Sequence, residues 1–120
     1  MKKIIIVDDD FAIRELVDTT LGSENYNIFQ AENGEQAIEI AKTEKPDLII
    51  MDIAMPGIGG FEATRILKSD PETKGSVIII LSGKSEDVER KKGFEVGADD
   101  YFTKPFSPLA LIKKVEEMIG

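Results

Sequence analysis

Polar residues follow four candidate strand segments of this 120-residue chain, three of them continuously apolar, and their types could do chemistry together. They are Asp8, Asp9 and Asp10 after the first segment, Asp52 after the second, Ser82 after the third and Lys104 after the fourth. In an open parallel sheet, ligands bind beyond the carboxyl ends of the strands, because those ends meet at one edge. If the four segments are parallel strands, acids, a hydroxyl and a cation converge in one site.

The acidic members of this set predict a magnesium site. Two carboxylates about 4 Å apart repel each other by about 4 kcal/mol at an effective dielectric constant of about 20, so a fold keeps them together only when something cancels the charge. The chain has no histidine and no cysteine, which leaves the hard oxygen ligands that magnesium prefers. Asp8, Asp9 and Asp52 are the candidate ligands, whereas Asp10 is better interpreted as the cap of a following helix.

Asp52 is also a candidate nucleophile. A carboxylate can attack phosphorus and form an aspartyl phosphate, while a metal ion and a lysine neutralise the charge that develops on the phosphoryl oxygens. Lys104 is the candidate cation, and the Ser82 hydroxyl can donate to a phosphoryl oxygen. Taken singly, Ser82 would be an ordinary turn residue and Lys104 a solvated lysine. Their shared position after apolar segments favours the chemical interpretation.

The segments that must position these residues are short and continuously apolar. Continuous apolarity is typical of strands that are covered on both faces, as in a parallel sheet. The clearest candidates are residues 4–7, 48–51 and 77–81, and the weaker ones are residues 27–30 and 100–103.

Helical patterns lie between the predicted strands. They are marked by apolar residues at helical spacing (Ile13, Leu16, Val17 and Leu21), by a candidate cap at Asn33 to which Gln36 could reach back, by residues 61–68 and 87–96, and by a serine–proline start at residues 107–108. Strand and helix alternate five times, which predicts an α/β fold with a parallel sheet and right-handed crossovers.

Composition excludes several classes of protein. A chain of 120 residues is expected to form one domain, residues 1–120, with one core. No apolar run approaches the roughly 20 residues of a membrane span. The segment before Asp8 is too short for a signal peptide, so a cytoplasmic location is expected. The formal net charge of −8 argues against a nucleic-acid-binding face in this domain.

The same residues, read in order, form a specific combination. It consists of Val7-Asp8-Asp9-Asp10, Asp52-x-x-Met55-Pro56 with Gly60 eight residues after Asp52, Ser82, and Gly97-Ala98-Asp99-Asp100-Tyr101-x-x-Lys104-Pro105-Phe106. Across essentially the whole chain, this combination resembles the response-regulator receiver family of two-component signalling. The resemblance implies a flavodoxin-like, doubly wound, five-stranded parallel sheet of order 2-1-3-4-5 with five helices.

The resemblance implies a role for each acidic residue. Asp52 would accept a phosphoryl group from a partner phosphohistidine. Asp8 and Asp9 would hold magnesium together with Asp52 and the backbone carbonyl of Ala54. The domain would catalyse its own phosphorylation and dephosphorylation without the turnover of a conventional enzyme.

The resemblance also implies a switch. Lys104 would pair with the phosphoryl group, and its bond to Pro105 would be cis. Ser82 would move toward the phosphoryl oxygens, and Tyr101 would swing inward behind it. Gly83 stands where alanine is more usual.

Partners follow from the resemblance as well. Because the chain has no histidine, the phosphoryl donor must be another protein, a histidine kinase or a histidine phosphotransfer protein. Residues 97–101 resemble receivers that form homodimers through helix 4, strand 5 and helix 5. Basic residues there could pair with Asp99 or Asp100 of a second copy; they are Arg90, Lys91, Lys113 and Lys114.

Three alternatives compete with this interpretation. A phosphatase of the haloacid dehalogenase type would have an acidic residue two positions after its nucleophile, where this chain has Ala54. A dinucleotide-binding domain would have a glycine-rich turn after its first strand, where this chain has three aspartates. A non-phosphorylated pseudo-receiver usually lacks part of the acidic set, which is complete here. The resemblance also implies that Ala54 and Lys84 occupy positions that vary in the family and tune hydrolysis of the phosphoaspartate, which we expect not to be especially fast.

Overall fold

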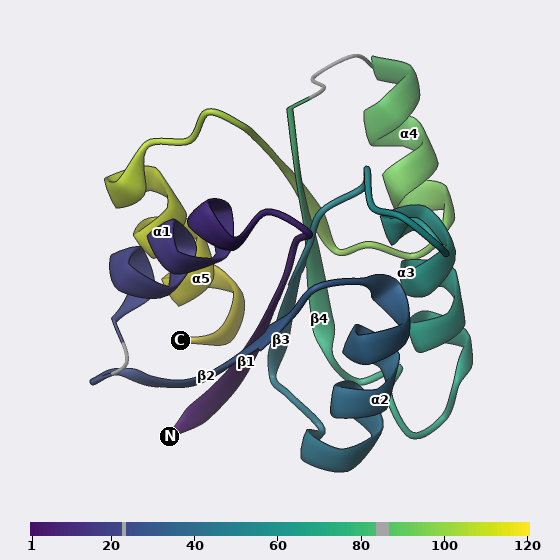
Figure 1. The fold of residues 1–120 in the computed structure, drawn as a ribbon, viewed down its shortest axis with the longest axis horizontal. Coiled ribbons are helices and arrows are strands. Elements are labelled where there is room, and N and C mark those ends of the chain that lie inside the picture. The colour runs from purple at the N-terminus through teal and green to yellow at the C-terminus, as the bar shows by residue number, and fades with distance from the viewer. Residues whose placement is uncertain (23, 84–86) are drawn as a thin grey trace.

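The computed structural model describes residues 1–22, 24–83 and 87–120, in which five strands alternate with five helices (Figure 1). The strands are β1 (Lys2–Val7), β2 (Tyr26–Ala31), β3 (Leu48–Met51), β4 (Val77–Ser82) and β5 (Asp100–Thr103). The helices are α1 (Phe11–Leu21), α2 (Gly34–Glu44), α3 (Gly60–Ser69), α4 (Asp87–Glu95) and α5 (Pro108–Ile119). Every predicted strand and helix is present. Within these described ranges, no helix has both the length and the apolarity that crossing a membrane requires.

The five strands form one parallel sheet in the order β2-β1-β3-β4-β5, which confirms the expected doubly wound topology. The register aligns the strand ends that carry the candidate site. Val7 pairs with Met51, so the next residue of each strand, Asp8 and Asp52, lies at the same level of the sheet. Ser82 pairs with Thr103, which places Lys104 beside the end of β4.

Helices cover both faces of the sheet, with α1 and α5 on one face and α2, α3 and α4 on the other (Figure 1). Alternate residues of each strand therefore enter different cores. Ile4 and Ile6 join one core with Val17 of α1 and Leu111 of α5, while the intervening side chains of β1 face α2 and α3 in the second core. This double burial explains why the strands are continuously apolar.

Three helices begin with the side-chain caps that the sequence predicts. Oδ1 of Asp10 accepts a hydrogen bond from the Ala12 amide at 2.9 Å. The Asn33 and Ser107 side chains likewise accept from backbone amides in the first turns of α2 and α5. The predicted return contact in α2 is wrong by one residue, because the Gln36 side chain accepts from the amide of Glu32.

Helix α1 departs from its apolar pattern at two positions. Leu16, which falls at helical spacing with Val17 and Leu21, is 49% exposed. Arg14 instead is only 7% exposed and lies on the buried side of the helix. A charged side chain therefore occupies a place where the pattern predicts an apolar one.

Candidate functional site

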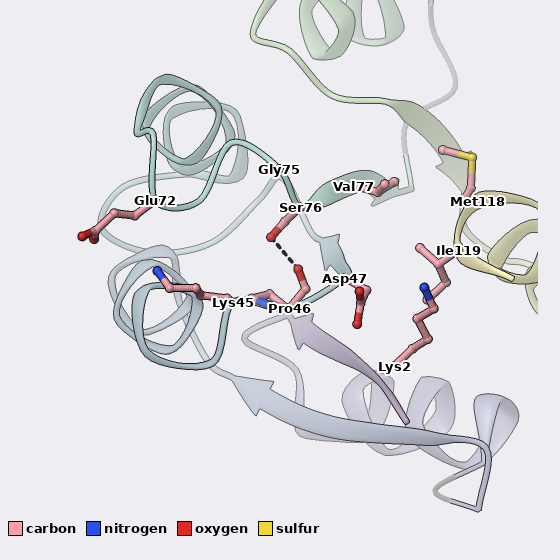
Figure 2. A pocket seen from close by; sticks show the side chains of 10 residues that line it. All are labelled: Lys2, Lys45, Pro46, Asp47, Glu72, Gly75, Ser76, Val77, Met118 and Ile119. Carbon is pink, nitrogen blue, oxygen red and sulfur yellow. Dashed lines mark hydrogen bonds between the residues drawn. The ribbon is translucent and has the colours of Figure 1, made fainter.

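Of two hollows at opposite edges of the sheet, the one at the carboxyl edge brings several acidic and basic side chains together. The hollow at the amino-terminal edge, about 500 Å³, is shown in Figure 2. Lys45 and Lys2 line it from opposite sides, and the Ser76 hydroxyl is already bonded to the Pro46 carbonyl at 2.6 Å (Figure 2). This hollow brings no set of reactive groups together.

The hollow at the carboxyl edge, about 370 Å³, is smaller but contains the predicted site. Its lining includes Asp8, Asp9, Asp10, Asp52, Ala54, Ser82, Gly83 and Lys104. Three different strand ends and the loop after β5 supply these residues. The residues that the sequence predicts to converge at this edge thus line one hollow, and their chemical roles stay a prediction.

Carboxylate oxygens of Asp8, Asp9 and Asp52 all lie within 4.8 Å of one another. Asp8 and Asp52 are buried, while Asp9 is exposed. Burial, and then the charge of Asp8, raises the pKa of Asp52 above its ordinary value, although Lys104 opposes this shift. Three convergent carboxylate oxygens in a solvent-accessible hollow fit a hard divalent cation that keeps some of its water.

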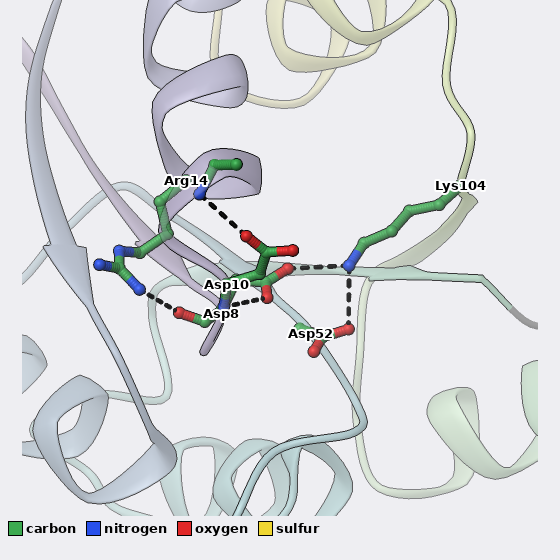
Figure 3. A network of polar contacts seen from close by, with 6 residues as sticks. Asp8, Asp10, Arg14, Asp52 and Lys104 are labelled. Atoms are coloured by element: carbon green, nitrogen blue, oxygen red, sulfur yellow. Dashed lines mark hydrogen bonds and ion pairs between the residues drawn. The ribbon is translucent and has the colours of Figure 1, made fainter.

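Lys104 provides the positive charge of the site (Figure 3). Its Nζ lies 2.8 Å from Oδ2 of Asp8 and 3.3 Å from Oδ1 of Asp52. Burial lowers the pKa of Lys104, but the hydrogen bond to Asp8 and the charges of Asp52 and Asp8 outweigh it, so the pKa is raised overall. The lysine is therefore held in its charged form between two acids. Its bond to Pro105 is cis, as the resemblance implies.

Backbone hydrogen bonds extend the sheet into the site. The amide of Asp8 donates to the Ala31 carbonyl at 3.1 Å, and the amide of Asp52 donates to the Val7 carbonyl at 2.9 Å. The amide of Lys104 donates to the Ser82 carbonyl at 2.6 Å. The side chains of the site are thus anchored by continuations of the strand pairing.

Gly60 lets the first turn of α3 approach the backbone of Asp52. The Gly60 amide donates to the Ile53 carbonyl at 3.0 Å. A Cβ atom at Gly60 would overlap the carbonyl oxygen of Asp52, so any larger residue requires a shift of the backbone. The glycine eight residues after Asp52 is therefore a packing requirement of the site.

The two candidate switch residues occupy different depths. Ser82 lines the hollow and is 4% exposed. Tyr101 is not among the residues that line the hollow; it is 4% exposed and packs with Ile80 and Ala98. The guanidinium carbon of Arg90, on α4, lies 5.1 Å from the centre of the Tyr101 ring.

Sequence reasoning missed Arg14, which approaches the site from α1 (Figure 3). Its Nη1 donates to the Asp8 carbonyl at 2.7 Å, and its Nε donates to Oε1 of Gln30 at 3.0 Å. The signal was available, because Arg14 stands in helical register with Val17 and Leu21. A charged residue in a buried stripe needs a polar partner.

Two further expectations concern Lys84 and the acidic pair Asp99 and Asp100. Lys84, which was expected to influence hydrolysis, lies outside the described residues. Asp99 and Asp100 were expected to meet basic residues of a second copy. Within this chain, Asp99 pairs with Lys68 and Asp100 pairs with Lys114, both at 2.8 Å.

Sequence comparison finds relatives along the whole chain. The family model described as response regulator receiver domain matches residues 4–116. The phosphate regulon transcriptional regulatory protein PhoB of Pseudomonas aeruginosa is 43% identical over 118 residues, which cover 98% of this chain and 52% of PhoB. Protein PilH of Pseudomonas aeruginosa is 37% identical over 120 residues, which cover 100% of this chain and 99% of PilH.

Coverage of the relatives differs. The transcriptional regulatory protein ResD of Bacillus subtilis is 43% identical over 117 residues, which cover 98% of this chain and 48% of ResD. The chain therefore spans about half the length of PhoB and ResD, but nearly all of PilH.

Solved structures match the same part of the chain. Chemotaxis protein CheY4 of Vibrio cholerae superposes with a TM-score of 0.92 at 31% identity, covering 98% of each chain. The beryllium fluoride-activated receiver domain of DrrB from Thermotoga maritima superposes with a TM-score of 0.89 at 33% identity, covering 98% of this chain and 97% of that one.

Proposed function

This chain belongs to the response regulator receiver domain family, and from that premise we propose that Asp52 accepts a phosphoryl group from a partner phosphohistidine. The observation that carries the proposal is the convergence of three carboxylates and one lysine at the carboxyl edge of the sheet. Residues 1–120 act as a single receiver domain. It is a signalling domain and not an enzyme with conventional turnover.

In the proposed reaction, a carboxylate oxygen of Asp52 attacks phosphorus. The oxygen–phosphorus bond forms as the bond between phosphorus and the donor imidazole nitrogen breaks, and the imidazole leaves with the electron pair. Asp8, Asp9, Asp52 and the carbonyl of Ala54 would hold magnesium, which supplies positive charge to the phosphoryl oxygens when it is bound. Lys104 pairs with another phosphoryl oxygen, and the domain itself promotes both phosphorylation and dephosphorylation.

The switch in this proposal consists of Ser82 and Tyr101. Ser82 lies at the end of β4, within the hollow that would receive the phosphoryl group, and its hydroxyl donates to a phosphoryl oxygen. Tyr101 lies on the neighbouring strand β5, two residues before Thr103, the pairing partner of Ser82, and in this proposal it follows the movement of Ser82. The buried position of the Tyr101 ring supports this coupling, because a displaced neighbour must be accommodated in a packed interior.

The proposed partners are a histidine kinase or a histidine phosphotransfer protein. A homodimer through α4, β5 and α5 is a further part of the proposal. In it, Lys114 would exchange its partner Asp100 for a carboxylate of the second copy, since the pair within one chain is already formed. We place the domain in the cytoplasm, where ATP-dependent kinases act.

Incubation with acetyl phosphate and magnesium, followed by intact mass, tests the proposal. A receiver gains the mass of one phosphoryl group, and the gain disappears when a chelator removes magnesium. A pseudo-receiver gains none under either condition. That second result would overturn the proposed function.

A further inference from the structure

We propose that Arg14 is a positioning residue for the magnesium site. Its guanidinium holds the peptide unit between Asp8 and Asp9 so that both carboxylates converge with Asp52. This inference rests on the magnesium site proposed above. Arg14 itself touches neither the metal nor the phosphoryl group.

The contact to Asp8 acts on two ligands at once. Nη1 of Arg14 donates to the Asp8 carbonyl at 2.7 Å, and Arg14 is only 7% exposed (Figure 3). That carbonyl belongs to the planar peptide unit that joins Asp8 to Asp9. Fixing the plane therefore limits one backbone torsion of each residue, and with it the direction of each side chain. Neighbouring groups that orient metal ligands in this way are a common part of metal sites.

Arg14 is itself held from a second direction. Its Nε donates to Oε1 of Gln30 on β2 at 3.0 Å. The Gln30 amide nitrogen donates in turn to Asp18 at 2.9 Å and to Glu15 at 3.4 Å, both on α1. These acceptors determine which end of the Gln30 amide faces Arg14. The planar guanidinium makes both bonds in one orientation, which a lysine ammonium cannot do.

The charge of Arg14 raises a competing explanation. Within the described residues, no carboxylate oxygen lies within 4.0 Å of an Arg14 nitrogen, although the side chain is buried. A buried cation without an ion pair is costly, so Arg14 could be retained only because its charge offsets that of the nearby acids. The two roles predict opposite effects on magnesium. A charge that merely offsets the acids weakens the binding of a cation, whereas a positioning group strengthens it.

Magnesium titrations followed by amide NMR shifts, well below the melting temperature, separate the two roles. We expect Arg14→Met to weaken magnesium binding by about tenfold or more, the usual effect of losing an orienting neighbour. Arg14→Lys keeps the charge but not both bonds, and should also bind more weakly. Gln30→Leu removes the acceptor of the Arg14 Nε bond but leaves the bond to the Asp8 carbonyl, so it should weaken magnesium binding less. Arg65→Met is the matched control, because it removes an arginine whose partner is the exposed Glu62 on α3.

Magnesium binding to Arg14→Met that is as tight as in the wild type, or tighter, would overturn the proposal in favour of charge compensation. If Arg14→Met does not fold, wild-type affinity in Arg14→Lys has the same meaning. Spectra of the metal-free proteins provide a second readout. The amides of Asp9 and Asp10 should shift in Arg14→Lys more than in Arg65→Met, and equal spectra contradict the proposal. A wild type that binds no magnesium refutes the proposed metal site, while the metal-free spectra still decide the role of Arg14.

Discussion

Nζ of Lys104 lies 2.8 Å from Oδ2 of Asp8, although the two residues are 96 positions apart in the sequence. The same nitrogen lies 3.3 Å from Oδ1 of Asp52. Without a metal, Lys104 is therefore the counterion of two buried acids. If magnesium takes over that task, Lys104 becomes able to bind a phosphoryl oxygen.

Replacing Lys104 by alanine should uncouple the site from the switch. Beryllofluoride with magnesium, which imitates the phosphoryl group, should shift the amide signals near Ser82 and Tyr101 in the wild type. We expect much smaller shifts in Lys104→Ala, because no cation then links the bound group to the loop after β5. Lys3→Ala is the control, since Lys3 pairs with Glu44 away from the site. Equal shifts in wild type and Lys104→Ala would refute this role.

Removing an acid should stabilise the metal-free protein, and the buried acid should matter more. Asp52→Asn removes a carboxylate that is desolvated and close to Asp8, so we expect a gain on the order of 1 kcal/mol in the free energy of unfolding, or about 4 °C in melting temperature. Asp9→Asn should give a smaller gain, because Asp9 is exposed and its charge is screened. Thermal melts without metal measure both.

Magnesium should stabilise the wild type more than either variant. It binds the folded site, so it should stabilise the wild type by RT ln(1 + [Mg]/Kd), about 2.7 kcal/mol at a hundredfold excess over Kd. Both variants should gain less, since each has lost a ligand charge. A full magnesium gain in Asp9→Asn would show that Asp9 is not a ligand.

The advantage of Asp52→Asn should depend on pH. Because the pKa of Asp52 is raised in the folded protein, folding favours its protonated form. The charged Asp52 carboxylate therefore destabilises the folded protein fully above its folded-state pKa. This destabilisation disappears as the pH falls below 3.8, the ordinary pKa of an aspartate side chain. Denaturant unfolding of metal-free wild type and Asp52→Asn should give the largest difference at neutral pH. A difference that grows toward acid pH has the wrong sign for this account.

Gly60→Ala tests the close approach of α3 to Asp52. The added methyl group overlaps the Asp52 carbonyl, so we expect a loss of about 1–3 kcal/mol, as for other overpacked positions. Gly75→Ala is the matched control, because a Cβ there meets nothing within 4 Å. Denaturant unfolding compares the two variants. Equal stabilities would show that the backbone accommodates the methyl group without cost.

The strand ends were predictable because a parallel sheet brings them to one edge. Continuous apolar runs located β1, β3 and β4, and the residues after them supplied Asp8, Asp52 and Ser82. The strand order came from the family resemblance and not from the apolar pattern itself. Predicting that Lys104 lies near Asp8 required both the strand pattern and the family resemblance, because the distance between the two residues depends on which strands are neighbours.

The features that the sequence did not predict are contacts that depend on tertiary packing. Leu16 fits the helical period but is exposed, whereas Arg14 is buried because Gln30 and the Asp8 carbonyl provide acceptors. Periodicity reports the face of a helix but not the polar groups that another strand presents to it. For Gln36 the sequence predicted the correct kind of contact with the wrong residue, because its side chain accepts from the amide of Glu32 and not from that of Asn33. Such details lie beyond the accuracy of a local pattern.

The central claim is that the phosphoryl group is attached to Asp52, and locating the modified residue tests it most directly. Borohydride reduces an aspartyl phosphate to homoserine, which peptide mass mapping can place in the sequence. After incubation with acetyl phosphate and magnesium, we expect homoserine at position 52 alone, although Asp8 and Asp9 lie within 4.8 Å of it. Asp52→Asn should give none. Homoserine at position 8 or 9 in the wild type, or undiminished labelling of Asp52→Asn, would contradict the account.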